Sequence, residues 1–214
     1  MRLKDKIAII TGSTRGIGLA IASEFARQGA IVFISSRKEE NVAKALRELQ
    51  NQFPDRIYGK ALHIGMIDQH APFVQFVTET AGTPDILVNN DAANPYFGPM
   101  LNLEWAAWDK TVQVNLKGAF GMSRETAKRS IEAKKALSIV NVSSIFGMMP
   151  CPHQGIYGMT KAALISMTKT LAHEWAPHSI RVNAIAPGLV NTHFASAIVQ
   201  NPQLSAMYTS RAAQ

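Results

Sequence analysis

Residues 6–28 read as an apolar strand, a glycine-rich turn and a helix, in that order. The strand is expected over Lys6–Thr11, which is almost entirely apolar. The turn, Gly12-Ser13-Thr14-Arg15-Gly16-Ile17-Gly18, follows at once, and a helical pattern continues to Gln28. Glycines in such a turn let the backbone approach a pyrophosphate closely, and the amino-terminal end of the next helix attracts the phosphate charge. The segment therefore predicts a dinucleotide-binding unit.

Five further apolar runs alternate with helical patterns along the chain. They cover residues 31–34, 57–64, 86–88, 138–142 and 180–185. Alternation of this kind predicts an α/β fold, a doubly wound parallel sheet of six strands with helices on both faces (Rossmann-type). Ligands of such sheets bind beyond the carboxyl ends of the strands, and Gly12, Asn89, Ser144 and Pro187 all fall there.

Composition limits the class of protein. The 214 residues are 47% hydrophobic and contain no linker or repeat, so we expect one dinucleotide-binding and catalytic domain over residues 1–214. A single cysteine, Cys151, excludes an internal disulfide framework. No apolar run approaches the roughly 20 residues of a membrane span. With no room for a signal peptide before the first strand and no carboxyl-terminal targeting tripeptide, a cytoplasmic location is expected.

The formal charge of +7 comes from basic residues that are dispersed along the chain. Because no basic patch interleaved with aromatic residues is present, we expect no nucleic-acid partner. The charge is interpreted as solvated surface, or as attraction for an anionic cofactor or substrate. The histidines show no metal-ligand grouping, so no metal site is expected.

Tyr157 and Lys161 are four residues apart and share one face of a predicted helix, and Ser144 precedes Tyr157 by thirteen residues. Free tyrosine loses its proton near pH ~10, and a neighbouring positive charge favours the phenolate. We therefore expect Lys161 to lower the pKa of Tyr157, so that the phenol can protonate an oxygen that is becoming an alkoxide.

Together these segments resemble the short-chain dehydrogenase/reductase family over nearly the whole chain. Thr11-Gly12-x-x-x-Gly16-x-Gly18 is similar to its cofactor turn, and Asn89-Asn90 to the start of its Asn-Asn-Ala-Gly segment. Pro187-Gly188 followed by Thr192 is similar to the turn that receives the nicotinamide. The resemblance implies hydride transfer between a nicotinamide cofactor and a carbonyl or alcohol, carried out by a catalytic tetrad of Asn115, Ser144, Tyr157 and Lys161.

The resemblance also implies a role for each residue of the site. Tyr157 is the general acid, Ser144 donates a hydrogen bond to the reacting oxygen, Lys161 binds the nicotinamide ribose, and Asn115 supports Lys161 through a water in a distorted helix. Substrate contacts are expected from Ser144, His153 and Tyr157. The expected cofactor contacts are Gly12, Thr14, Arg15, Gly16, Ile17, Gly18, Ser36, Arg37, Asn89, Tyr157, Lys161, Pro187, Gly188, Val190 and Thr192.

The choice of cofactor is predicted at the end of the second strand. An NAD enzyme usually presents an acid there to the ribose hydroxyls, whereas this chain has Ser35-Ser36-Arg37. A guanidinium beside a hydroxyl suits a 2'-phosphate, and Arg15 offers a second cation. NADP(H) is therefore expected in preference to NAD(H). The alternative is that Arg37 merely begins a solvated helix.

Three features depart from the family pattern. Gly65 stands where many members carry an aspartate that contacts adenine, and Asp91 places a carboxylate close to the cofactor. The chain stops at Gln214, soon after an expected substrate loop at about residues 188–210, so the family's final strand and helix are expected to be absent. An unpaired sheet edge and uncovered apolar surface would then favour abnormal association. The family itself implies a homo-oligomer.

The leading hypothesis is an NADPH-dependent carbonyl reductase that acts reversibly on a small carbonyl or alcohol. The Asn94-Pro95-Tyr96-Phe97-Gly98 run and Gly65 most resemble the carbonyl and retinal reductase branch. An alternative is a 3-oxoacyl-thioester reductase, for which the positive charge could attract an acidic carrier protein. A third hypothesis is a truncated, weakly active or non-catalytic interaction protein.

Overall fold

The computed structural model describes residues 1–192 of the chain. They form one parallel sheet of six strands in the order β3-β2-β1-β4-β5-β6. The predicted doubly wound sheet is confirmed, although the third strand ends at Ala61 rather than at residue 64. The strands are β1 (Ile7–Ile10), β2 (Ile31–Ser36), β3 (Ile57–Ala61), β4 (Ile86–Asn89), β5 (Leu137–Val142) and β6 (Ile180–Ile185).

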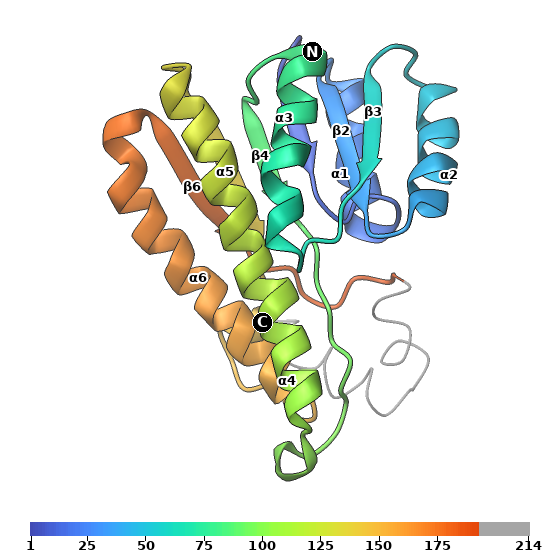
Figure 1. Cartoon of the computed structure of the whole chain (residues 1–214). Coiled ribbons are helices and arrows are strands. Elements are labelled where there is room, and N and C mark those ends of the chain that lie inside the picture. The colour runs from blue at the N-terminus through green and yellow to red at the C-terminus, as the bar shows by residue number, and fades with distance from the viewer. Residues whose placement is uncertain (193–214) are drawn as a thin grey trace.

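Helices cover both faces of the sheet. In Figure 1, α3, α5 and α6 lie in front of the strands and α1 lies behind them. The α-helices are α1 (Gly16–Arg27), α2 (Glu39–Gln50), α3 (His70–Ala81), α4 (Trp105–Val112), α5 (Ala119–Glu132) and α6 (Gly155–Trp175). A π-helical turn, η3 (Gln113–Gly118), joins α4 to α5, and short 3₁₀ turns cover Ile67–Gln69, Met100–Asn102, Ile145–Gly147 and Ala176–His178.

The apolar core is divided by the sheet into two clusters. Ile7 and Ile9 of β1 belong to the cluster that packs under α3, α5 and α6. Ile10 belongs to the cluster under α1 and α2. Successive strand residues point to opposite faces, so a strand covered on both sides must be apolar throughout. This explains why β1 is a continuous apolar run that is buried at every position.

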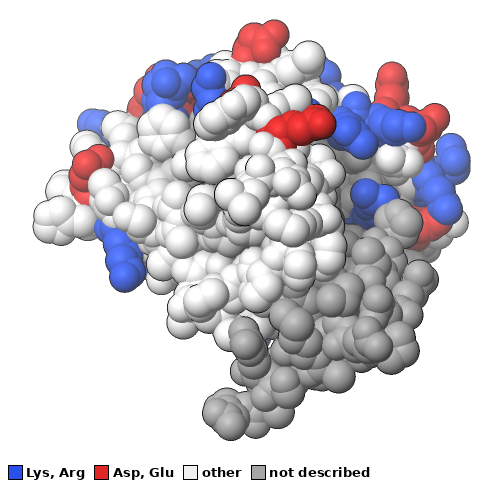
Figure 2. All heavy atoms as spheres, turned by 90° about the horizontal axis from the view of Figure 1, so that it is seen from below, with Lys and Arg blue, Asp and Glu red and all other residues white. Residues whose placement is uncertain are grey.

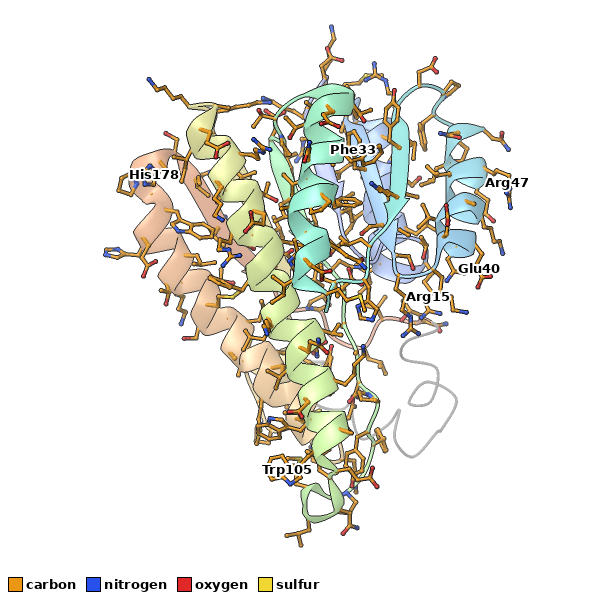
Figure 3. The ribbon with its side chains drawn as sticks, viewed as in Figure 1. Arg15, Phe33, Glu40, Arg47, Trp105 and His178 are labelled. Carbon is orange, nitrogen blue, oxygen red and sulfur yellow. The ribbon has the colours of Figure 1, made fainter. Side chains whose placement is uncertain are left out.

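The site lies where the chain changes direction across the sheet. β1 is flanked by β2 and β4, and the connections that leave β1 and β4 run toward opposite edges of the sheet. In open sheets this arrangement leaves a crevice beyond the carboxyl ends of the central strands. In Figure 3, Arg15 lies at this lower end of the sheet and His178 at the opposite end. Of the expected substrate loop, residues 193–210 lie outside the described residues.

Candidate active site

A cavity of about 500 Å³ opens at the carboxyl ends of the strands. Its walls come from the turn between β1 and α1, the ends of β2, β4 and β5, the start of α6 and the segment after β6. The predicted residues that line it are Gly12, Thr14, Arg15, Gly16, Ile17, Ser36, Arg37, Ser144, Tyr157, Lys161, Pro187, Gly188, Val190 and Thr192. The fold therefore brings together residues that were grouped from sequence alone.

The glycine turn needs its glycines for two separate reasons. Gly12 and Gly16 have φ values of +60° and +58°, a left-handed conformation that glycine adopts readily. Gly18 is buried behind the turn, where a Cβ atom would lie 2.5 Å from both Asn90 Nδ2 and the Gly12 carbonyl oxygen. Asn90 Nδ2 donates to the carbonyl oxygens of Thr11 and Gly12 at 3.1 and 3.0 Å. The turn is thus held in shape by Asn90, with no room for a side chain at Gly18.

Asn89 does not line the cavity, contrary to expectation. Its side chain is buried on the other side of β4, where Nδ2 donates to Ser123 Oγ and Asn141 Oδ1, both at 2.8 Å. The adjacent Asn90 lines the cavity instead. Asn89 therefore links β4 to β5 and α5 within the protein, and its side chain is not in place to contact a cofactor.

Tyr157 and Ser144 meet in the wall of the cavity. Ser144 follows β5, Tyr157 lies in the first turn of α6, and only 8% of Tyr157 is exposed. Burial raises the pKa of Tyr157 to about 12, and a hydrogen bond with Ser144 offsets only part of that rise. Burial disfavours the phenolate because it removes the charge from water. Tyr157 therefore keeps its proton at neutral pH.

Lys161 is one turn beyond Tyr157 and is almost completely buried. Its Nζ donates to the carbonyl oxygen of Val142 at 2.7 Å and lies 5.6 Å from the centroid of the Tyr157 ring. The pKa of Tyr157 is raised, so the expected net lowering of that pKa is wrong for this structure. The physical reason is that burial dominates at Tyr157, while the ammonium group is directed to a backbone carbonyl.

Asp91 provides a negative charge on the same side of the cavity. Burial lowers the pKa of Lys161 to about 8, and the nearby carboxylate of Asp91 opposes this change. Burial raises the pKa of Asp91 to about 6, while a hydrogen bond with Thr11 and the charge of Lys161 lower it. The Asp91 Oδ2 atom is buried and has no hydrogen-bond partner among residues 1–192. The unexpected acid is thus partly balanced by Lys161.

Asn115 lies in the π-helical turn η3, within the distorted stretch that the resemblance implied for this residue. Its Oδ1 accepts from the Ala93 backbone N–H at 2.7 Å, and its Nδ2 donates to the Ala93 carbonyl and to Thr160 Oγ1, both at 3.0 Å. The side chain is buried outside the cavity. Asn115 therefore connects the segment after β4 to α6, beside Lys161.

His153 lies outside the cavity, contrary to the expected substrate contact. It is exposed, its φ of +63° turns the backbone, and its ring stacks on Phe97 with centroids 5.7 Å apart. The adjacent Gln154 lines the cavity instead and is 3% exposed. Gln154 is the residue before α6 and has a non-helical backbone, so helical spacing from Tyr157 offered no signal for it.

The outer part of the cavity is positively charged. Arg15 and Arg37 are exposed there, and no salt bridge within residues 1–192 involves either of them. Lys110 Nζ lies 3.3 Å from His63 Nε2, and both residues line the cavity, although sequence reasoning had not singled them out. Viewed from below, charged side chains of both signs lie around the rim of this face, while its middle carries few charges (Figure 2).

Gly65 contributes no side chain to the cavity. A Cβ atom there would lie 3.2 Å from His63 Cε1 and 3.3 Å from Gln113 Cγ, and Gln113 Nε2 donates to the Gly65 carbonyl at 3.0 Å. His63 and Gln113 thus crowd the place where a carboxylate could have contacted adenine. Within residues 1–192, no three His, Cys, Asp or Glu side chains are grouped to hold a metal, and no helix is long and apolar enough to cross a membrane.

Comparisons with known proteins agree with this geometry. A family profile described as short chain dehydrogenase matches residues 6–203. The chain is 39% identical over 196 residues to dehydrogenase/reductase SDR family member 4 of Sus scrofa, covering 92% of this chain and 70% of that protein. It is also 39% identical over 203 residues to short-chain dehydrogenase/reductase SDRA of Arabidopsis thaliana, covering 95% and 78% of the two chains.

Two solved structures are similar to the whole described fold. One is a gluconate 5-dehydrogenase from Burkholderia cenocepacia in complex with NADP and tartrate, with a TM-score of 0.90, 30% identity, and coverage of 96% of this chain and 80% of that one. The other is a variant of actinorhodin polyketide ketoreductase with NADPH, with a TM-score of 0.85, 31% identity, and coverage of 92% and 75%.

Proposed function

This chain belongs to the short-chain dehydrogenase/reductase family, and on this basis we propose that it is an NADP(H)-dependent carbonyl reductase. Family membership makes it a hydride-transfer oxidoreductase. The observation that carries the finer proposal is one cavity that holds Ser144, Tyr157 and Lys161 together with Arg15 and Arg37. The first three can act on a carbonyl, and the two arginines offer positive charge to a phosphate.

The residues of the cavity fit a nicotinamide dinucleotide. The left-handed Gly12 and Gly16 and the closely packed Gly18 make a turn over which a pyrophosphate can approach the backbone. A side chain at Gly188 would meet no atom of residues 1–192 within 4 Å, so the described part of the segment after β6 leaves space beside the cavity. NADP(H), when bound, supplies or accepts the hydride.

Tyr157, Ser144 and Lys161 would then manage the proton. Because its pKa is raised, Tyr157 carries a proton at neutral pH and can donate it to the oxygen of a carbonyl that is being reduced. Ser144, which shares a hydrogen bond with Tyr157, can donate to the same oxygen. The buried charge of Lys161 favours the phenolate that remains, and Asn115 holds the helix that carries both residues.

The preference for NADP(H) is supported by charge at the end of β2. Ser36 and Arg37 line the cavity there, with Arg15 in the neighbouring turn. A guanidinium can bind the 2'-phosphate through paired hydrogen bonds, whereas NADH offers it no such group. The two similar structures carry NADP and NADPH.

A 3-oxoacyl thioester is the second candidate substrate. The similarity to a polyketide ketoreductase favours it, and so does the formal charge of +7, which could attract an acidic carrier protein. The expectations of a homo-oligomer, of a cytoplasmic location and of no nucleic-acid partner stay predictions.

The test is to follow NADPH oxidation by the purified protein with a panel of ketones, aldehydes and a 3-oxoacyl thioester. We expect turnover of at least one ketone or aldehyde, faster with NADPH than with NADH. Turnover of the thioester alone would favour the second candidate. Absence of turnover with every substrate would contradict the proposal and leave a weakly active or non-catalytic interaction protein.

A further inference from the structure

Two amide side chains face each other in the cavity wall next to the catalytic residues. Gln154 is the residue before α6, and Asn94 belongs to the segment that follows β4; both line the cavity. Asn94 Nδ2 donates to Gln154 Oε1 at 2.6 Å. Tyr157 lies in the first turn of α6, and it lines the same cavity as Gln154 and Asn94. A substrate in this cavity therefore shares it with Tyr157 and with this pair.

The remaining atoms of the pair are buried without partners. Asn94 Oδ1 and Gln154 Nε2 have no hydrogen bond to any residue in the described range 1–192. A buried polar atom without a partner is costly, and such atoms at a cavity wall point to a ligand that completes them. Exchanging the oxygen and nitrogen of both amides changes nothing essential, because the pair would still present one acceptor and one donor.

We propose that Asn94 and Gln154 form a polar subsite that selects carbonyl substrates bearing a hydroxyl group on the first or second carbon from the reacting carbonyl. This inference rests on the proposed function and specifies its substrate class. A hydroxyl oxygen can accept from Gln154 Nε2 and donate to Asn94 Oδ1 at the same time.

Other substituents leave the subsite incomplete. An alkyl group satisfies neither amide atom, and it would keep both of them buried and unpaired. The second carbonyl of a 3-oxoacyl thioester can only accept, so Asn94 Oδ1 would stay without a donor. The subsite therefore favours hydroxylated ketones or aldehydes over the thioester candidate.

The test uses substrates in which a methyl group replaces the hydroxyl. The pairs are 2-hydroxyacetophenone with propiophenone, and 3-hydroxy-1-phenylpropan-1-one with butyrophenone, each reduced with NADPH. In at least one pair we expect the hydroxylated ketone to have a kcat/KM about tenfold higher or more, because a site built to bond a hydroxyl discriminates against its absence. Equal kcat/KM values in both pairs would overturn the inference.

A hydroxyl group also makes a neighbouring carbonyl more reactive, whatever the enzyme. The decisive quantity is therefore how the ratio of kcat/KM for the hydroxylated ketone to kcat/KM for its methyl partner differs between parent and variant. The double variant Asn94→Leu with Gln154→Met removes both amides at similar volume. Its preference for the hydroxylated ketone over the methyl partner should fall about tenfold. The control Gln52→Met alters an exposed amide outside the cavity and should keep the parent ratio. A ratio unchanged in the double variant would contradict the subsite.

If no ketone is reduced, the proposed function fails, and the subsite is then decided by binding. Saturation-transfer NMR with the same substrate pairs, on parent and double variant with NADP⁺ present, needs no turnover. Stronger transfer to the hydroxylated ketone that is lost in the double variant supports the subsite. Equal transfer within each pair, or a preference that survives in the double variant, overturns it.

Discussion

Asp91 and Lys161 influence each other through their charges inside the cavity, although they come from segments seventy residues apart. Burial disfavours the charged form of each group, and the opposite charge of the other group offsets part of that effect. Asp91, which departs from the family pattern, is therefore a counter-charge for Lys161. The positive charge of Lys161 also reduces the repulsion that the Asp91 carboxylate would exert on an anionic cofactor.

Asp91→Asn should move the alkaline limb of the pH profile to lower pH. The carboxylate raises the pKa of Lys161, so removing its charge lets that pKa fall further below about 8. Lys161 then loses its proton earlier as the pH rises, and kcat/KM declines earlier. The measurement is kcat/KM for reduction of one ketone at a series of pH values in parent and variant. Superimposed alkaline limbs would show that the two charges are not coupled during turnover.

Arg37→Ala should reduce the preference for NADPH over NADH. We expect the parent to bind NADPH more tightly, and the variant to lose about tenfold or more of that advantage, as is usual for a hydrogen bond between charged groups. Higher salt should shrink the advantage in the parent as well. Titration calorimetry with both cofactors measures it.

Lys38→Ala is the matched control for Arg37→Ala. Lys38 is the next residue, pairs with Glu40 at 3.1 Å and does not line the cavity, so this variant should keep the NADPH preference. Equal affinity of the parent for NADPH and NADH would rule out the role assigned to the end of β2.

His70→Gln should cost less stability in acid than at neutral pH. His70 is fully buried against Gly121, Nε2 contacts the Ile64 carbonyl oxygen at 2.8 Å, and burial lowers its pKa. The unfolded chain therefore takes up the proton more readily, so the stability contributed by neutral His70 is present above about pH 6.5 and is lost as the pH falls below it.

Urea unfolding of parent and variant at about pH 7.5 and about pH 5.5 measures this effect. The difference in unfolding free energy between the two proteins should shrink at the lower pH. His173→Gln, which alters an exposed histidine of α6, should show no such change. A constant difference between parent and His70→Gln would mean that His70 can be protonated without cost in the folded state.

Much of the site could be predicted because its parts carry local patterns. The glycine turn, the apolar strands and the spacing from Ser144 to Lys161 each follow from chain geometry, so the fold brings them together as expected. The error at Asn89 is a shift of one residue. Asn89 and Asn90 point to opposite sides, as neighbours at a strand end do, and only the sheet fixes which of them faces the cavity.

The remaining errors concern burial and loop conformation. His153 was expected in the cavity, but its left-handed backbone turns it outward and leaves Gln154 inside. The pKa of Tyr157 depends on how much water surrounds the phenol and on where the Lys161 ammonium points. Sequence spacing predicts neither the solvent exposure of the phenol nor the direction of the ammonium group, because both arise from packing of elements that are distant in the chain.

The central claim is that Tyr157 is the proton donor of an NADPH-dependent carbonyl reductase. The most direct test is single-turnover NADPH oxidation with a ketone that the parent reduces, in parent and Tyr157→Phe, together with NADPH titration of both proteins. We predict that the variant binds NADPH as the parent does while its rate falls about 10²- to 10⁴-fold, the usual contribution of general acid catalysis. A rate loss smaller than about tenfold would contradict the account and place the acid elsewhere.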